Sequence, residues 1–173
     1  MSDKTAAPWK DDIFDAMKTC GVEVVGYVPD AGHAHVIRRC VEDNDIQDVA
    51  LTTEEEGVAL AAGAWLGGKK SALLMQSSGV GNCVNMLSMR ETGRYPLVIL
   101  VTMRGEWAEF NPWQVPMGSK TQEVLELCGF KVERVTDPDE VGETVAAAID
   151  FAYAGDIGVA VLISQKLIGA KTW

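Results

Sequence analysis

The 173-residue sequence has no hydrophobic run long enough to cross a lipid bilayer. Its longest strongly apolar run near the middle of the chain is PLVILVTM, at 96–103. A membrane-spanning helix needs about 20 such residues. The opening residues, MSDKTAAPWKDD, are polar and lack the apolar core of a secretory signal. We therefore expect a cytoplasmic protein that has no membrane partner.

Positive charge is also scarce. The chain has 15 Lys and Arg residues against 25 Asp and Glu residues, which gives a formal net charge of −10. A protein that binds mainly to nucleic acid or to an anionic membrane needs the opposite balance. The composition therefore argues against both partners, but it leaves room for one local cationic site that binds a small anion.

The sequence contains neither a C-x-x-C pair nor a cluster of metal ligands. The four cysteines are far apart along the chain, which indicates free thiols in a reducing compartment. The two histidines, His33 and His35, form an H-x-H pair without further ligands nearby in the sequence. We therefore predict no metal site formed by this chain. The cysteines are Cys20, Cys40, Cys83 and Cys128.

What the chain does contain is a regular alternation of two patterns. Several of the strand-like segments are continuous apolar runs, which is typical of a parallel sheet buried on both faces. We predict one α/β domain in three layers, with a parallel sheet of about six strands and helices on both faces. An aromatic-rich loop spans 104–119. The predicted strands are 22–28, 48–52, 71–76, 96–102, 130–135 and 158–164, and the predicted helices are 8–20, 34–43, 54–66, 80–92, 120–128 and 138–154.

Three consecutive acids, Glu54, Glu55 and Glu56, precede the predicted helix 54–66. Acids in a first helical turn can form a capping box, and the helix dipole favours them by about 0.3–1 kcal/mol. The helix itself is unusually rich in small residues, including Gly57 and Ala59, which leave space for another helix or a flat ligand. At this point both a structural role and a chemical role for the triplet stay open.

The segment QSSGVGNCVN, at 76–85, follows a predicted strand and contains a G-x-G pair. A dinucleotide fingerprint needs a third glycine, and Val84 stands in its place. Neither a P-loop nor a G-x-S-x-G nucleophile elbow is present. Ligands of open α/β sheets bind at the carboxyl ends of strands, so this segment is a candidate binding loop as well as a simple turn.

Together, the two motifs resemble the pyrimidine-binding domain of thiamine-diphosphate enzymes. The family form has an acid about nine residues before a Gly-Tyr pair, and counting back nine from Ala64, the first residue of Ala64-Trp65, reaches Glu55. The resemblance implies that thiamine diphosphate is the cofactor and that Glu55 is the catalytic carboxylate that activates its aminopyrimidine ring. It further implies cofactor contacts from Ser78, Gly79, Gly81 and Asn82.

A narrower resemblance covers nearly the whole chain. The segments GYVPDAGHAHVIRRC, MQSSGVGN and LVTMRGEW are similar to those of sulfopyruvate decarboxylase alpha subunits, with the phosphonopyruvate decarboxylases as close relatives. This implies a 2-oxo acid decarboxylase whose substrate is sulfopyruvate or, alternatively, phosphonopyruvate. The implied substrate-binding residues are Asp30, His33, Gln76 and Arg104.

Each of these substrate-binding residues also has an ordinary structural interpretation. Asp30 and Gln76 suit turns, and His33 suits a loop. Arg104 follows a buried strand, where a guanidinium can grip a sulfonate in two-pronged fashion. It can equally form an ion pair with Glu106 or Glu109.

One part of the thiamine-diphosphate family pattern is missing. These enzymes hold the diphosphate through Mg²⁺ with a G-D-G motif and a later Asn, whereas here Gly155-Asp156 is followed by Ile157. The resemblance therefore implies that residues 1–173 form the pyrimidine-binding domain alone. A beta subunit would then carry the diphosphate domain and bind most of the Mg²⁺, in a hetero-oligomer. The competing hypotheses are a nucleotide-binding, Rossmann-like module without catalysis, and a structural or regulatory relative.

Overall fold

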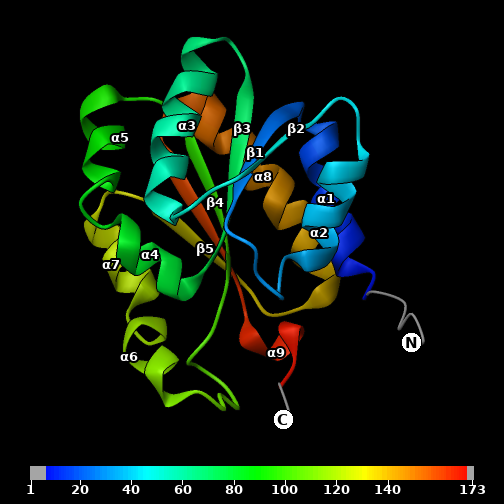
Figure 1. The fold of residues 1–173 in the computed structure, drawn as a ribbon, viewed down its shortest axis with the longest axis vertical. Coiled ribbons are helices and arrows are strands. Elements are labelled where there is room, and N and C mark those ends of the chain that lie inside the picture. The colour runs from blue at the N-terminus through cyan, green and yellow to red at the C-terminus, as the bar shows by residue number, and fades with distance from the viewer. Residues whose placement is uncertain (1–6, 171–173) are drawn as a thin grey trace.

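The computed structural model describes residues 7–170, which form one six-stranded sheet in which all strands are parallel (Figure 1). The strand order is β2-β1-β3-β4-β6-β5. This confirms the predicted α/β fold with a parallel sheet. The strands are β1 (Val22–Tyr27), β2 (Gln47–Ala50), β3 (Lys70–Gln76), β4 (Leu97–Thr102), β5 (Lys131–Val135) and β6 (Gly158–Ile163).

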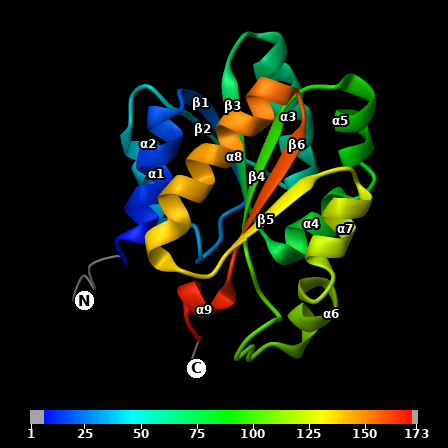
Figure 2. The same cartoon turned by 180° about the vertical axis from the view of Figure 1, so that it is seen from behind.

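Helices cover both faces of the sheet and give the predicted three layers. One core lies under α1 (Trp9–Thr19), α2 (Ala34–Glu42) and α8 (Val141–Gly155). Figure 2 shows α8 crossing that face from behind. The other core lies under α3 (Glu54–Leu66), α4 (Ser77–Cys83), α5 (Leu87–Gly93) and α7 (Thr121–Leu127).

The position of β4 in the middle of the sheet explains why its sequence is almost entirely apolar. Side chains of a strand point alternately to the two faces, so a strand between two helical layers needs apolar residues at every position. All six residues of β4 are buried. Val98 and Leu100 enter one core, and Leu97, Ile99 and Val101 enter the other.

The structure differs from the predicted elements in a few places. The predicted helix 80–92 is two helices, because α4 starts directly after β3 and ends at Cys83, and α5 begins at Leu87. Gly79, Gly81 and Asn82 are weak helix formers, so α4 stays short. The loop at 104–119 contains the short helices η1 (Pro112–Gln114) and α6 (Val115–Gly118). The first three residues of the predicted helix 138–154 form a separate short helix, η2 (Pro138–Glu140), and the short helix α9 (Gln165–Ile168) was not predicted.

The sheet has a topological switch point between β1 and β3. The chain leaves β1 towards β2 on one side, and β3 leads to β4 on the other. The loops after two such strands diverge and leave a crevice at the carboxyl edge, where ligands bind in open α/β sheets. This edge lies at the bottom of Figure 1.

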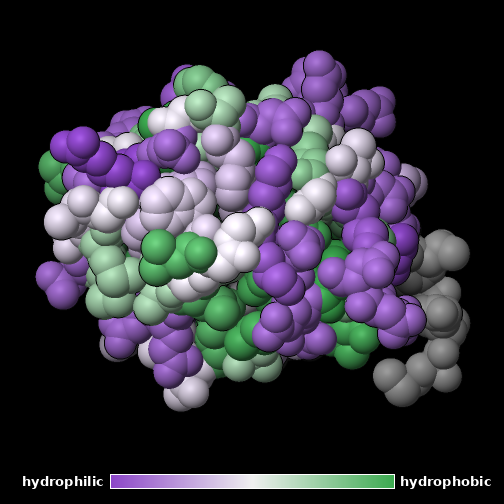
Figure 3. All heavy atoms as spheres, turned by 90° about the horizontal axis from the view of Figure 1, so that it is seen from above, coloured by the Kyte–Doolittle hydropathy of each residue, from purple (hydrophilic) through white to green (hydrophobic). Residues whose placement is uncertain are grey.

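Figure 3 looks onto the opposite edge, where hydrophilic side chains are interspersed with smaller hydrophobic areas. From residue 7 to residue 170, no helix is both long and apolar enough to cross a membrane.

Candidate active site

The three consecutive glutamates at the start of α3 lie in three different environments. Glu54 is buried, with 8% of its surface exposed, whereas Glu55 is exposed. The Glu56 carboxylate turns back and accepts a hydrogen bond from the Thr52 backbone N–H at 2.8 Å. This contact resembles a capping box, which satisfies backbone donors before the first turn. The structural interpretation of the triplet therefore applies to Glu56, and Glu54 is the carboxylate that points inward.

The Glu54 carboxylate lies against α4. The Asn82 side-chain amide donates a hydrogen bond to Glu54 Oε2 at 2.9 Å. A Cβ atom added to Gly79 would lie only 2.5 Å from Glu54 Oε1, so the carboxylate fills the space of a missing side chain. Two residues predicted to contact the cofactor, Gly79 and Asn82, thus fix a carboxylate at the carboxyl edge of the sheet.

The sequence contains a signal for Glu54 that our count did not use. The count to Glu55 started from Ala64, the first residue of Ala64-Trp65. Gly63 directly precedes this pair, and counting back nine positions from Gly63 reaches Glu54. The prediction of Glu55 as the catalytic carboxylate is not tested by these contacts, and Glu54 is a second candidate for that role.

Asp30 is the centre of a hydrogen-bond network at the switch point. The Thr102 hydroxyl donates to Asp30 Oδ2 at 2.5 Å, and the Gln76 amide donates to Asp30 Oδ1 at 3.1 Å. The Ser78 hydroxyl in turn donates to Gln76 Oε1 at 2.9 Å. Burial alone would raise the pKa of Asp30, but the nearby His33 imidazole and the hydrogen bonds outweigh it and lower the pKa.

His33 is buried at the start of α2, with 1% of its surface exposed. Its Nε2 lies 3.0 Å from the Leu100 carbonyl oxygen. Burial lowers the pKa of His33, and the Asp30 charge and the Leu100 and Met75 carbonyls oppose this shift. In the neutral ring, Nε2 must carry the proton, because a carbonyl only accepts. Nδ1 is then an acceptor, and it is buried without a hydrogen-bond partner among the described residues. The predicted substrate contact of His33 is not tested by this geometry.

Arg104 forms the ion pair that was the alternative to substrate binding. Its Nε and Nη2 atoms donate to the two Glu109 oxygens at 2.8 Å and 2.5 Å. Both side chains are buried, and the guanidinium carbon lies 5.1 Å from the centre of the Phe110 ring. Two of the guanidinium nitrogens are therefore directed to Glu109, while the predicted sulfonate contact stays a prediction.

Glu109 is the centre of a clasp that folds the 104–119 loop against the sheet. Besides Arg104, it accepts from the backbone N–H groups of Gly105 and Asn111, both at 3.0 Å, and from Gln165 Nε2 at 2.9 Å. The Arg104 hydrogen bond is the main cause of a pKa of about 2 for Glu109. Gln165 also accepts from the backbone N–H groups of two other loop residues, Glu106 and Trp107.

Sequence reasoning missed two polar residues of this edge, Thr102 and Gln165. Thr102 is the last residue of β4, so its position at a strand end was a usable signal. Gln165 had none, because its partners lie 56 to 59 residues away in the sequence.

The helix α4 connects the two groups of site residues. Ser78 holds Gln76 and so reaches Asp30, and Asn82 holds Glu54. Ser78 and Asn82 are four residues apart, so they lie on one face of the helix. Gly81 faces α6, because an added Cβ would lie 3.1 Å from the Met117 sulfur. The carboxyl edge thus brings together predicted residues from the loop after β1, from the end of β3 and from α4.

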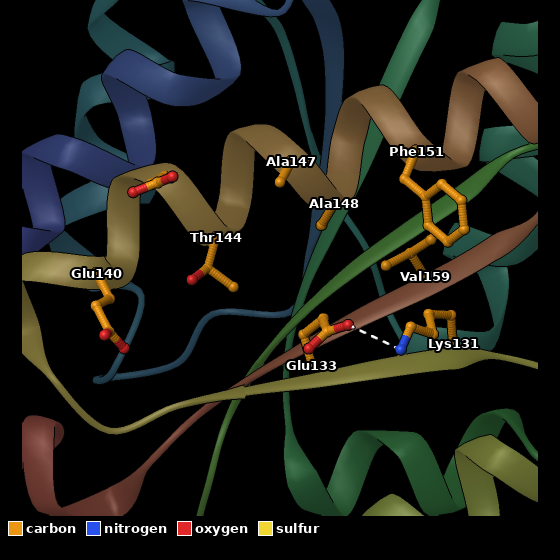
Figure 4. A pocket seen from close by; sticks show the side chains of 9 residues that line it. Lys131, Glu133, Glu140, Thr144, Ala147, Ala148, Phe151 and Val159 are labelled. Atoms are coloured by element: carbon orange, nitrogen blue, oxygen red, sulfur yellow. Dashed lines mark ion pairs between the residues drawn. The ribbon is translucent and has the colours of Figure 1, made fainter.

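A cavity of about 490 Å³ lies away from these residues, between α8 and the edge strand β5 (Figure 4). Phe151, Ala148 and Val159 form its apolar part, and Lys131 and Glu133 form an ion pair across 3.0 Å at its rim. None of the predicted site residues lines this cavity. It is therefore not the candidate site.

The Glu109 clasp makes a testable contribution to stability. Glu109→Gln should lower the free energy of unfolding by up to about 3 kcal/mol at pH 7, because the carboxyl pKa is lowered from 4.5 to about 2 on folding. A lowered folded-state pKa gives stability that is present above pH 4.5 and is lost as the pH falls towards 2. Urea denaturation should therefore show the difference from wild type shrinking over this range.

Glu123→Gln is the matched control for this measurement. Glu123 is 65% exposed and pairs with Lys120 on the surface, so its replacement should change stability very little. A difference between wild type and Glu109→Gln that stays constant from pH 7 to pH 2 would contradict the assigned role of the clasp.

Comparison with known protein families gives a match to the thiamine pyrophosphate enzyme, N-terminal TPP binding domain, over residues 9–114. This covers more than half of the chain. A search of solved structures finds a 2-oxoglutarate:ferredoxin oxidoreductase from Magnetococcus marinus with a TM-score of 0.73 and 16% identity. The alignment covers 92% of this chain and 29% of the other, and at this identity it shows a shared fold.

The sequence relatives are more specific. The sulfopyruvate decarboxylase subunit alpha of Methanococcus maripaludis is 35% identical, over 87% of this chain and 91% of its own. The corresponding subunit of Methanocaldococcus jannaschii is 32% identical, over 87% and 89%. The phosphonopyruvate decarboxylase of Streptomyces viridochromogenes is 34% identical, over 79% of this chain but 35% of its own. The chain therefore belongs to the thiamine pyrophosphate enzymes and, within them, to the family of the sulfopyruvate decarboxylase alpha subunits.

Proposed function

We propose that this chain is the alpha subunit of a thiamine-diphosphate-dependent decarboxylase that converts sulfopyruvate to sulfoacetaldehyde and carbon dioxide. The observation that carries the proposal is the buried Glu54 carboxylate, held by Asn82 and Gly79 at the carboxyl edge of the sheet. The named alpha-subunit relatives support it, because they match this chain over about nine-tenths of their own length.

The donor set around Glu54 suits the aminopyrimidine part of the cofactor. A carboxylate at the edge of a dry interior can accept a strong hydrogen bond from a protonated ring nitrogen. Asn82 fixes the direction of the carboxylate, and the missing side chain of Gly79 lets Glu54 lie directly against α4. When bound, thiamine diphosphate supplies the ring that accepts the electrons released with carbon dioxide.

The three-residue start of α3 allows a paired test of which acid acts on the cofactor. In the complete enzyme, Glu54→Gln should lower the rate of carbon dioxide release by on the order of 10²-fold or more. The reason is that the amide is neutral and cannot exchange a proton with the cofactor ring as a carboxylate can. Glu55→Gln should leave the rate within a few-fold, since that side chain is exposed.

The opposite result has a clear meaning. Loss of activity in Glu55→Gln alone would reinstate the count from Ala64-Trp65 and remove Glu54 from the chemistry. A thermal melt of each variant controls for folding, because Glu54 is buried and its replacement changes the interior.

The substrate site is proposed at the switch point, from Asp30, His33, Gln76 and Arg104. Arg104→Ala should raise the KM for sulfopyruvate about tenfold or more, if the guanidinium binds the sulfonate. Glu109→Gln is the matched control, since it removes the same ion pair but keeps the cation. Equal KM increases in both variants would show that only the folding of the loop matters.

The same assay with phosphonopyruvate tests the closest alternative substrate, which the phosphonopyruvate decarboxylase relatives favour.

A beta subunit is proposed to complete the site by adding the diphosphate domain and most of the Mg²⁺ ligands. Two features support this. Over residues 7–170, no group of three or more acidic, His or Cys side chains is arranged to hold a metal. The 104–119 loop also exposes large apolar side chains, with Trp107 41% and Trp113 86% exposed. Such surfaces are typical of interaction sites.

The partner requirement is tested by measuring carbon dioxide release from sulfopyruvate with thiamine diphosphate and Mg²⁺. The chain alone should be inactive, and the chain co-purified with its partner should be active. Trp113→Ala should weaken that co-purification, while Phe151→Ala, on the opposite face of the sheet, should not. An active isolated chain would refute the split site, and a complex that binds no thiamine diphosphate would refute the enzyme proposal itself.

A further inference from the structure

Both oxygens of the Asp30 carboxylate are occupied by donors from neighbouring strands. Oδ2 accepts from Thr102 at the end of β4, and Oδ1 accepts from Gln76 at the end of β3. These strands are adjacent and in register, with Gln76 opposite Thr102. The carboxylate is therefore held from two fixed points of the sheet, although Asp30 itself lies in a loop.

The direction of each hydrogen bond is determined by its surroundings. Thr102 is 1% exposed, and its hydroxyl has one competing acceptor, the Met75 carbonyl at 3.4 Å, which is much farther than Asp30 at 2.5 Å. The Ser78 hydroxyl donates to Gln76 Oε1, and this turns the amide so that its N–H₂ group faces Asp30.

Gly32 makes the close approach of the loop to β4 possible. A Cβ atom at this position would lie 2.6 Å from the Thr102 methyl carbon and 2.9 Å from Asp30 Oδ2. The loop could not reach the strand with any side chain there. The contact between Thr102 and Asp30 therefore depends on the absence of a side chain at Gly32.

We propose that Thr102 is a positioning residue of the active site, whose hydroxyl holds Asp30 as an oriented, ionised carboxylate facing the substrate. This inference rests on the proposed function, because the role of Asp30 at the substrate does. Thr102 itself is buried and acts through Asp30, so its contribution depends on one hydrogen bond rather than on contact with substrate. The lowered pKa of Asp30 is consistent with an acceptor that stays ionised.

The test compares two replacements of Thr102 in the complete enzyme. Thr102→Val keeps the shape and the methyl group that packs on Gly32 but removes the donor, and kcat/KM should fall about tenfold or more. Thr102→Ser keeps the donor and should retain kcat/KM within about threefold. If the serine variant loses as much as the valine variant, packing and not the hydroxyl is responsible, and the proposal fails.

A double-mutant cycle connects the effect to Asp30. In an Asp30→Ala background, Thr102→Val should cause no further loss, because the group it orients is gone. Independent, multiplying losses would overturn the proposal. Thermal melting of each variant detects misfolding, and Thr102→Ala provides a second donor-free variant if the valine side chain is not tolerated.

A second readout does not depend on catalysis. Carbon-13 NMR titration of the Asp30 carboxyl in the full chain should show a higher pKa in Thr102→Val than in wild type or Thr102→Ser. The other groups that act on this carboxyl are the His33 imidazole, the Gln76 amide and the Gly32 backbone N–H, and all are kept in these variants. An unchanged pKa would refute the positioning role even in an active enzyme. A raised pKa in a chain that turns over no 2-oxo acid would instead refute only the proposed function.

Discussion

The arrangement of this site depends on the contact between the Glu54 carboxylate and the backbone of α4. The carboxylate occupies the volume that any side chain at position 79 would need, and it is anchored by Asn82 one turn farther along the same helix. Because α4 starts directly after β3, its position is fixed by the sheet. The same short helix carries Ser78, which reaches Asp30 through Gln76. Two carboxylates, Asp30 and Glu54, are thereby connected to the same short helix.

The sequence predicts the sheet well because the physical signal is strong. A strand such as β4, with five consecutive apolar residues at 97–101, fits between two helical layers, and its neighbours follow from the alternation. Single side chains are harder. Successive residues of a helix point about 100° apart, so neighbouring acids can lie in very different environments, and the sequence does not show which of them is buried. This separates Glu54 from Glu55. The break between α4 and α5 follows three weak helix formers, Gly79, Gly81 and Asn82, which the predicted helix 80–92 did not take into account.

The carboxyl edge of this acidic protein contains one buried positive charge that is paired with a carboxylate, Arg104 with Glu109. The chain carries a net charge of −10 and is proposed to bind an anionic substrate, so long-range attraction gives no help in capture. Arg104 is nevertheless kept buried at the edge, in a two-pronged pair with Glu109 and over the Phe110 ring. A buried cation without its partner would be strongly destabilising. The pair therefore lets the protein keep a guanidinium near the site while the loop around it stays folded.

The clasp at Glu109 has a consequence for when the 104–119 loop can be held in place during synthesis of the chain. Its amide donor, Gln165, follows the last strand and lies 56 residues farther along the chain. Contacts of such long sequence separation form late, because the intervening chain must first be ordered. A nascent chain that has emerged as far as α8 already holds Asp30, Glu54 and Arg104, yet it lacks the residue that fastens the loop. A chain that ended after α8 would therefore keep these acids and the arginine but lose the hydrogen bonds between Gln165 and the 104–119 loop.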